Sequence, residues 1–129
     1  MNPANLAGTD PLAALFALLG SLPAPVRQSM RGLYRQTLLD QLELLAHALR
    51  GPDTGAQQVL AHKIAGSAAM MQDSGLADAL RALSVAIVGA DRVTVSAGWQ
   101  RVQSCAGRTL EALEARDVGN AAAPGRVRS

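Results

Sequence analysis

The sequence predicts an all-α protein, specifically an up-down four-helix bundle preceded by a short additional N-terminal helix. Aromatic residues make up only 2% of the chain, so Leu, Ala, Val, Ile and Met must fill the interior, and this mixture favours helices over strands. Apolar residues recur at spacings of three and four in the long segments, and no segment shows sustained period-two alternation. The length of 129 residues suits one compact domain.

The first two predicted helices differ in length. The first is short and covers about residues 11–19, with Thr9 or Asp10 as its N-cap and Gly20 at its end. A long second helix carries an apolar stripe of Tyr34, Leu38, Leu42, Leu45 and Leu49. The segment RGPDTG, residues 50–55, is expected to end it.

Three further helices complete the predicted bundle. Thr54 and Gln57 have the Thr-x-x-Gln spacing of a capping box, so the third helix should begin near Thr54 and run to about Gln72. The fourth and fifth helices carry stripes of Leu76, Leu80, Leu83 and Ile87, and of Val95, Trp99, Val102, Ala106, Leu110 and Leu113. Short turns between these helices favour the up-down arrangement.

The helices place the folded domain at residues 11–116, between a flexible N-terminus, residues 1–10, and a flexible basic tail, residues 117–129. The apolar run Leu12–Leu19 has no Lys or Arg before it, and it is far shorter than the ~20 residues that cross a bilayer. The single cysteine, Cys105, can form no internal disulfide. We therefore expect a cytoplasmic protein without a membrane segment.

Charge and motifs argue against several classes of function. The formal net charge is +2, and the basic residues are scattered, so the basic stripe and stacking aromatics of a nucleic-acid-binding protein are missing. Cys105 has no partner at metal-ligand spacing, so no metal site is expected. The sequence also lacks a glycine-rich phosphate-binding loop, which argues against autonomous use of ATP.

The third predicted helix has an unusual outer face. At 100° per residue, Leu60, Ile64, Ser67 and Met71 lie within roughly 60° of one another and form the stripe expected to face the core. His62 lies about 200° from Leu60 and is expected to point into solvent. The residues expected around it are Gln58, Ala65, Gly66 and Ala69, with Val59 and Met70 at the border of this face.

Small residues beside an imidazole suit the close approach of a partner. Gly66, one turn after His62, costs roughly 1 kcal/mol relative to alanine in a helix interior, and its missing Cβ leaves room for a partner's backbone. Lys63 can place its charge beside an anion held on the ring, and Val59 and Met70 offer an apolar docking patch. This combination predicts a phosphoryl acceptor.

Structural interpretations of these residues remain open. Gly66 could be a helix-packing glycine, and Lys63 could lie along the edge of the bundle. The second histidine, His47, is expected to be solvated, and Met71 and Trp99 are interpreted as core residues.

The segment AHKIAGSAAMM, residues 61–71, followed by Gly75 and a Leu-rich helix, resembles the histidine-containing phosphotransfer (HPt) domain of bacterial multistep phosphorelays. The family signature is His-Lys-Leu-Lys-Gly-Ser/Ala, and the matching residues are His62, Lys63, Ile64, Gly66, Ser67 and Ala68. The resemblance extends more loosely over residues 11–115. Two positions depart from the family: Ala65 replaces a second basic residue, and Leu83-Ser84 replaces Leu-Glu.

The resemblance implies that His62 accepts a phosphoryl group from the aspartate of one receiver domain and passes it to the aspartate of another. Lys63 would stabilise the phosphoryl group, magnesium would come from the receiver domain, and this chain would need no cofactor. The implied partners are receiver domains of a hybrid sensor histidine kinase or of response regulators. The chain would act as a monomeric carrier in a two-component phosphorelay, rather than as an enzyme.

Two alternatives belong to other classes of function. The first is an HPt-like adaptor that is not phosphorylated and regulates a kinase or response regulator by binding. The presence of Ala65 in place of the family's second basic residue favours this alternative. The second is a hydrolase or an independent transferase that uses His62 as a general base. No Ser/His/Asp or metal-ligand constellation in the sequence supports the second alternative.

Overall fold

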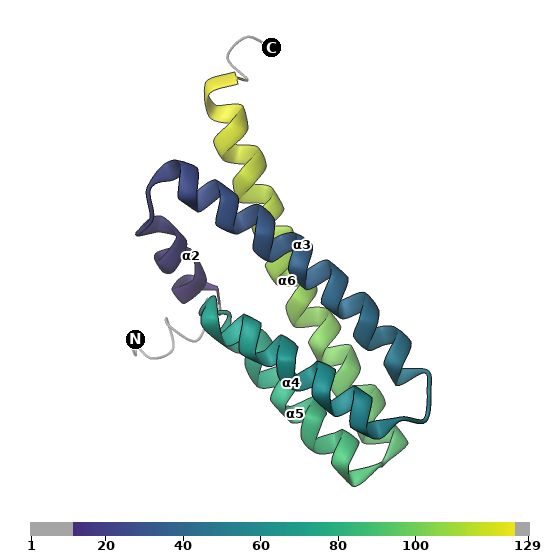
Figure 1. Ribbon diagram of the computed structural model, residues 1–129. Helices are drawn as coiled ribbons and strands as arrows, with labels where there is room; N and C mark the ends of the chain where they lie inside the picture. Colours follow the sequence, from purple (N-terminus) through teal and green to yellow (C-terminus); the bar gives the residue numbers. More distant parts are fainter. Residues whose placement is uncertain (1–11, 126–129) are drawn as a thin grey trace, which may run out of the picture.

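The computed structural model describes the backbone of residues 12–125 and the side chains of residues 12–115. Within these ranges the chain forms five helices and no strand (Figure 1). The helices are α2 (Ala13–Gly20), α3 (Ala24–Leu49), α4 (Thr54–Met70), α5 (Ser74–Gly89) and α6 (Arg92–Gly125). The all-α prediction is therefore confirmed for the described residues.

The start of α4 is capped differently from the prediction. The helix begins at Thr54 as expected, but the preceding Asp53 is its N-cap, and its carboxylate accepts a backbone N–H at 3.0 Å. The predicted capping box of Thr54 and Gln57 is wrong because Gln57 is buried. Its amide donates to the carbonyls of Ala48, at 3.0 Å, and Gly51, at 2.9 Å. Gln57 thereby ties the start of α4 to the end of α3.

The end of the last helix can be compared with the prediction, whereas the predicted start of the first helix cannot. The backbone of α6 is helical to Gly125, whereas the sequence predicted the helical domain to end at residue 116. The extra length includes three consecutive alanines, 121–123, the residue type with the highest helix propensity. The predicted caps Thr9 and Asp10, like the predicted flexible N-terminus, lie outside the described residues.

The four longer helices lie side by side, with the short α2 at one end (Figure 1). Each of the four contacts two others: α4 packs against α5 and α3, and α6 packs against α5 and α3. The α4–α5 contact is the most extensive, and α2 adds to the core through Leu15 and Leu19. One hydrophobic core therefore lies between the long helices.

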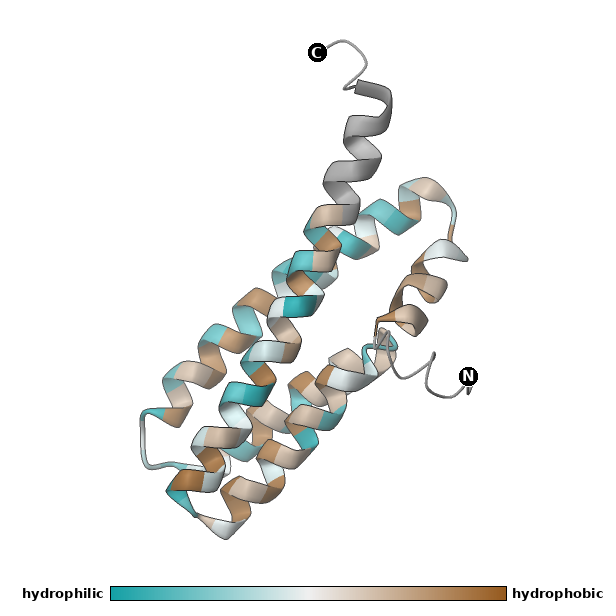
Figure 2. Ribbon diagram, turned by 180° about the vertical axis from the view of Figure 1, so that it is seen from behind, coloured by the Kyte–Doolittle hydropathy of each residue, from teal (hydrophilic) through white to brown (hydrophobic). Residues whose placement is uncertain are grey.

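The predicted apolar stripes account for most of this core. All four residues of the apolar stripe predicted for α5 are buried, namely Leu76, Leu80, Leu83 and Ile87. In α3 and α6 the buried stripe residues are Tyr34, Leu38, Leu45, Val102, Ala106 and Leu113, and the half-buried ones are Leu42, Leu49, Val95, Trp99 and Leu110. Figure 2 shows apolar and polar positions interleaved along these helices, as expected where one side of each helix is buried.

A buried carboxylate joins three of the helices near the turn between α4 and α5. Asp73, only 1% exposed, accepts hydrogen bonds from the hydroxyls of Tyr34 on α3, at 2.7 Å, and Thr109 on α6, at 2.8 Å. Burial raises the pKa of Asp73, and the two hydrogen bonds oppose this rise. This group, which we call the Asp73 cluster, fixes α3, α5 and α6 to one another through satisfied polar contacts.

Candidate functional site

His62 is exposed on α4, outside the buried face of that helix. The buried residues of α4 are Gln57, Ala61, Ile64, Ala65 and Ala68. A cavity of about 520 Å³ opens beside the imidazole, and its lining residues are Gln58, Val59, His62, Lys63 and Ser84. The predicted exposure of His62 is confirmed, and the ring lies beside a concave surface between α4 and α5.

The residues predicted to surround His62 are not all exposed. The placement of Ala65 on the outer face is wrong, because Ala65 is 3% exposed and belongs to the core. Ala69 and Gln58 are half-buried. The close packing of α4 on α5 through small side chains turns Ala61 and Ala65 inward, so the buried face is rotated from the predicted one. Ala65 therefore offers no surface to a docking partner.

The predicted core stripe of α4 is correspondingly displaced. Ile64 and Met71 are buried as expected, whereas Leu60 and Ser67 are only half-buried. From Val59 onward, the exposed side of the helix consists of His62, Lys63 and Gly66, with Val59, 67% exposed, and Met70, 80% exposed. We call this surface the His62 face.

Gly66 leaves the backbone of α4 open to solvent. It is exposed, and a Cβ built on it would meet no heavy atom within 4 Å outside its own helix backbone. The structure therefore contradicts the alternative in which Gly66 allows a neighbouring helix to pack closely. A glycine in mid-helix destabilises the helix relative to alanine, and no packing contact among the described residues offsets this cost at Gly66.

The two polar side chains of this face have no structural task among the described residues. The imidazole of His62 forms no hydrogen bond with them, and the ammonium of Lys63 forms no ion pair with them. In a neutral imidazole one ring nitrogen keeps its lone pair, and the exposed side chain of His62 has no hydrogen-bond partner among the described residues. His62 can therefore act as a nucleophile toward a group that a partner delivers.

Ser84 is a site residue that the sequence did not indicate. It lies on α5, is half-buried, and lines the His62 cavity together with residues of α4. In the sequence it marked only a departure from the HPt pattern. The one sequence signal for Ser84 is that it follows the buried Leu83. A residue next to an apolar stripe lies at the edge of the buried face of its helix, where it can border a neighbouring helix.

Other chemistry has little support in this region. No carboxylate lines the His62 cavity, so a general-base mechanism there lacks a group to orient the ring or hold a nucleophile. The described residues include no cluster of His, Cys, Asp and Glu that could hold a metal ion. His47 is exposed as predicted, with Nδ1 3.4 Å from a guanidinium nitrogen of Arg50.

None of the helices in the described part of the chain has the length and apolar character needed to span a membrane. Comparisons of the chain with protein-family models, with curated proteins and with solved structures found no match.

Proposed function

We propose that this protein is an HPt-type phosphoryl carrier, in which His62 accepts a phosphoryl group from the aspartate of one receiver domain and passes it to the aspartate of another. The observation that carries the proposal is the exposed imidazole of His62, which has no hydrogen-bond partner among the described residues and lies on a helix face cleared by Gly66. The HPt-like segment around His62 supports the same function.

The chemistry requires little from this chain. A ring nitrogen of His62 attacks the phosphorus of the aspartyl phosphate, a P–N bond forms, and the P–O bond to the aspartate breaks with release of its carboxylate. The proton on the other ring nitrogen stays in place. Transfer to the second receiver reverses these bond changes. Because phosphoryl transfer depends mainly on positioning and charge, a receiver that supplies the magnesium ion and most contacts can complete the site.

Three neighbours of His62 have roles in this proposal. Lys63 is the one Lys or Arg among the residues that line the cavity, so its ammonium would stabilise the phosphoryl oxygens. Ser84 offers a hydroxyl from α5, and Gly66 allows a receiver to approach the ring. At the position of the family's second basic residue, Ala65 is buried, so no exposed cation replaces it.

The proposal also includes the finer architecture. In an up-down four-helix bundle, α4 is held on one side by α3 and on the other by α5, and this agrees with the observed contacts. A histidine on such a supported helix keeps its position when a partner docks. We take the protein to act as a cytoplasmic monomer that meets receiver domains one at a time.

Label transfer tests this function directly. The purified full chain is incubated with a panel of radiolabelled phospho-receiver domains, and the label should move to the chain as an acid-labile, comparatively base-stable phosphohistidine. The His62→Gln variant should lose this label completely. The matched control His47→Gln, which changes the other exposed histidine, should be labelled as the wild type is.

Two results would contradict the proposal. Label that persists in His62→Gln would place the acceptor elsewhere. Binding of a receiver by the wild type without any transfer of label would instead identify an adaptor. The burial of Ala65, and the presence of only one Lys or Arg among the residues that line the His62 cavity, would then explain this function.

A further inference from the structure

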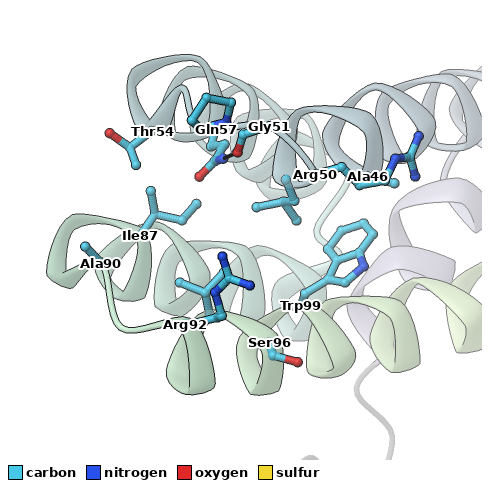
Figure 3. Close-up of a pocket in the computed structure, with 13 residues that line it drawn as sticks. Ala46, Arg50, Gly51, Thr54, Gln57, Ile87, Ala90, Arg92, Ser96 and Trp99 are labelled. Carbon is cyan, nitrogen blue, oxygen red and sulfur yellow. Dashed lines mark hydrogen bonds between the residues drawn. The ribbon is translucent and has the colours of Figure 1, made fainter.

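A second and larger cavity opens at the end of the molecule where the α3–α4 and α5–α6 connections meet (Figure 3). Its volume is about 720 Å³, within the range of cavities that take small molecules. It shares no lining residue with the His62 cavity. This end cavity is therefore a separate candidate site, independent of the proposed phosphotransfer.

One face of α6 forms a wall of the end cavity. Arg92, Val95, Ser96 and Trp99 follow one another at helical spacing, so they lie on the same side of the helix. In Figure 3 Arg92 and Trp99 extend from α6 toward α3 and the start of α4. Leu49 and Ile87 add apolar surface from α3 and α5. The wall thus combines an indole ring and aliphatic side chains with one guanidinium.

The charge of the end cavity has a single sign. Arg92 and Arg50 line it, and no carboxylate does, although the guanidinium of Arg50 lies 3.4 Å from Nδ1 of His47, which is not a lining residue. Neither guanidinium forms an ion pair with an acidic group in the part of the chain that the structure describes. Arginine that lines a concave surface without a carboxylate is suited to bind an anion, because its planar head donates several hydrogen bonds to carboxylate, sulfonate or phosphate oxygens.

The acidic residues nearest in sequence are engaged elsewhere. Asp91, which precedes Arg92, accepts hydrogen bonds from the Thr94 hydroxyl and from the backbone N–H of Val93, the latter at 3.3 Å. Asp53 caps α4. Both carboxylates therefore serve the first turns of helices, and the positive charge at Arg92 is left for a ligand.

We propose that the end cavity binds a small aromatic anion. Its charged group would contact the guanidinium of Arg92, and its ring would lie against Trp99 and Ile87. Aromatic and aliphatic lining with a few polar groups that fix orientation is the usual composition of a small-molecule site. An anion without an apolar body would leave the Trp99 side of the cavity unused.

The single tryptophan of the chain makes this proposal measurable. Naphthalene-2-sulfonate is titrated into the isotope-labelled full chain, and proton–nitrogen correlation spectra are recorded. The indole N–H signal of Trp99 should shift in a saturable way. Naphthalene-2-methanol, which has the same ring without the charge, should bind about tenfold more weakly or worse.

Two arginine variants locate the charge contact. Arg92→Gln should weaken binding of the sulfonate about tenfold. The matched control Arg101→Gln changes another exposed arginine of α6 that does not line the cavity, and it should bind as the wild type does. Since Arg92 is exposed, its replacement should not unfold the chain, and far-ultraviolet circular dichroism checks this.

The proposal fails if the sulfonate leaves the Trp99 signal unmoved, if the neutral compound binds equally well, or if Arg92→Gln binds with unchanged affinity. As a further check, Ser96→Phe should fill part of the cavity and block the sulfonate while the helices remain folded. Undiminished binding by a folded Ser96→Phe protein would also overturn the site.

Discussion

The His62 face of α4 and the Asp73 cluster are both polar, but they differ in burial and in partners. His62 and Lys63 are exposed, and neither side chain is hydrogen-bonded or ion-paired to a described residue. Asp73 is buried, and the hydroxyls of Tyr34 and Thr109 both donate to its carboxylate. The polar groups of the His62 face are therefore accessible to a binding partner, whereas those of the Asp73 cluster bind one another inside the protein.

This difference separates stability from function in the molecule. A buried polar group that loses its partner destabilises a protein by the full cost of its desolvation, whereas substitutions of exposed, unpartnered groups change stability little. Changes in the Asp73 cluster should therefore alter the free energy of unfolding, and changes on the His62 face should alter the proposed phosphotransfer.

The largest effect on stability is expected from Asp73→Ala. The substitution removes the acceptor of two buried hydroxyls, on Tyr34 and Thr109, and replaces the residue that precedes α5. We expect a loss of about 2–4 kcal/mol in the free energy of unfolding, measured by urea denaturation followed by circular dichroism. The folded fraction of this variant should still accept label on His62.

The comparison variant for this measurement is His62→Ala. Because His62 is exposed and has no hydrogen-bond partner among the described residues, its loss should change the free energy of unfolding by no more than about 0.5 kcal/mol. Equal destabilisation by Asp73→Ala and His62→Ala would show that the two regions do not differ in the way described.

The next effect is a pH dependence that belongs to Asp73. Burial raises the pKa of this carboxyl above its ordinary value of 3.8, so the folded protein keeps the proton at pH values where the unfolded chain has lost it. Its contribution to stability is therefore greatest below pH 3.8. The contribution decreases, by at most about 1.4 kcal/mol per pH unit, as the pH rises through the folded-state pKa.

Asp73→Asn isolates this contribution. An amide oxygen there can still accept from Tyr34 and Thr109, but it does not titrate. Urea denaturation of both proteins from pH 4 to pH 7 should show that the wild type loses stability relative to the variant as the pH rises. Asp91, whose pKa is lowered chiefly by the Thr94 hydroxyl, contributes in the opposite direction, but equally in both proteins. Parallel stability curves would contradict the raised pKa of Asp73.

The sequence predicted the two regions unequally well. The exposure of His62 and Gly66 was predicted from their positions around one helix relative to Leu60 and Ile64. The Asp73 cluster depends on Tyr34 and Thr109, which come from different helices and meet only when α3, α5 and α6 pack. From the sequence, Tyr34 belonged to an apolar stripe and Asp73 to a turn, and nothing indicated that they interact.

The rotation of α4 was the main error on the His62 face. Its stretch of alanines, including Ala61 and Ala65, carries little periodic signal, because small apolar residues suit both a buried and an exposed face. The contact with α5 determines which alanines are buried. Ser84 could not be assigned for the same reason, since it reaches the cavity only through that contact.

A smaller effect on stability than that of Asp73→Ala, and the sharpest test of the His62 face, is expected from Gly66→Ala. An added methyl group meets no heavy atom within 4 Å outside the helix's own backbone, so the helix should gain about 0.5–1 kcal/mol of stability. The same methyl group would project one turn from His62, on the surface that a docking receiver approaches. Label transfer to His62 should therefore become about tenfold slower although the protein is more stable.

The control for this combination of higher stability and slower label transfer is Gly107→Ala on α6. Gly107 is also exposed in a helix, and a Cβ there also meets nothing within 4 Å, but it is remote in sequence from His62. It should give the same gain in stability with an unchanged rate of label transfer. If Gly66→Ala transfers label as fast as Gly107→Ala does, the cleared flank of α4 has no part in docking. The destabilisation of α4 by Gly66 would then not be linked to faster label transfer, and His62 alone would distinguish this face from the rest of the surface.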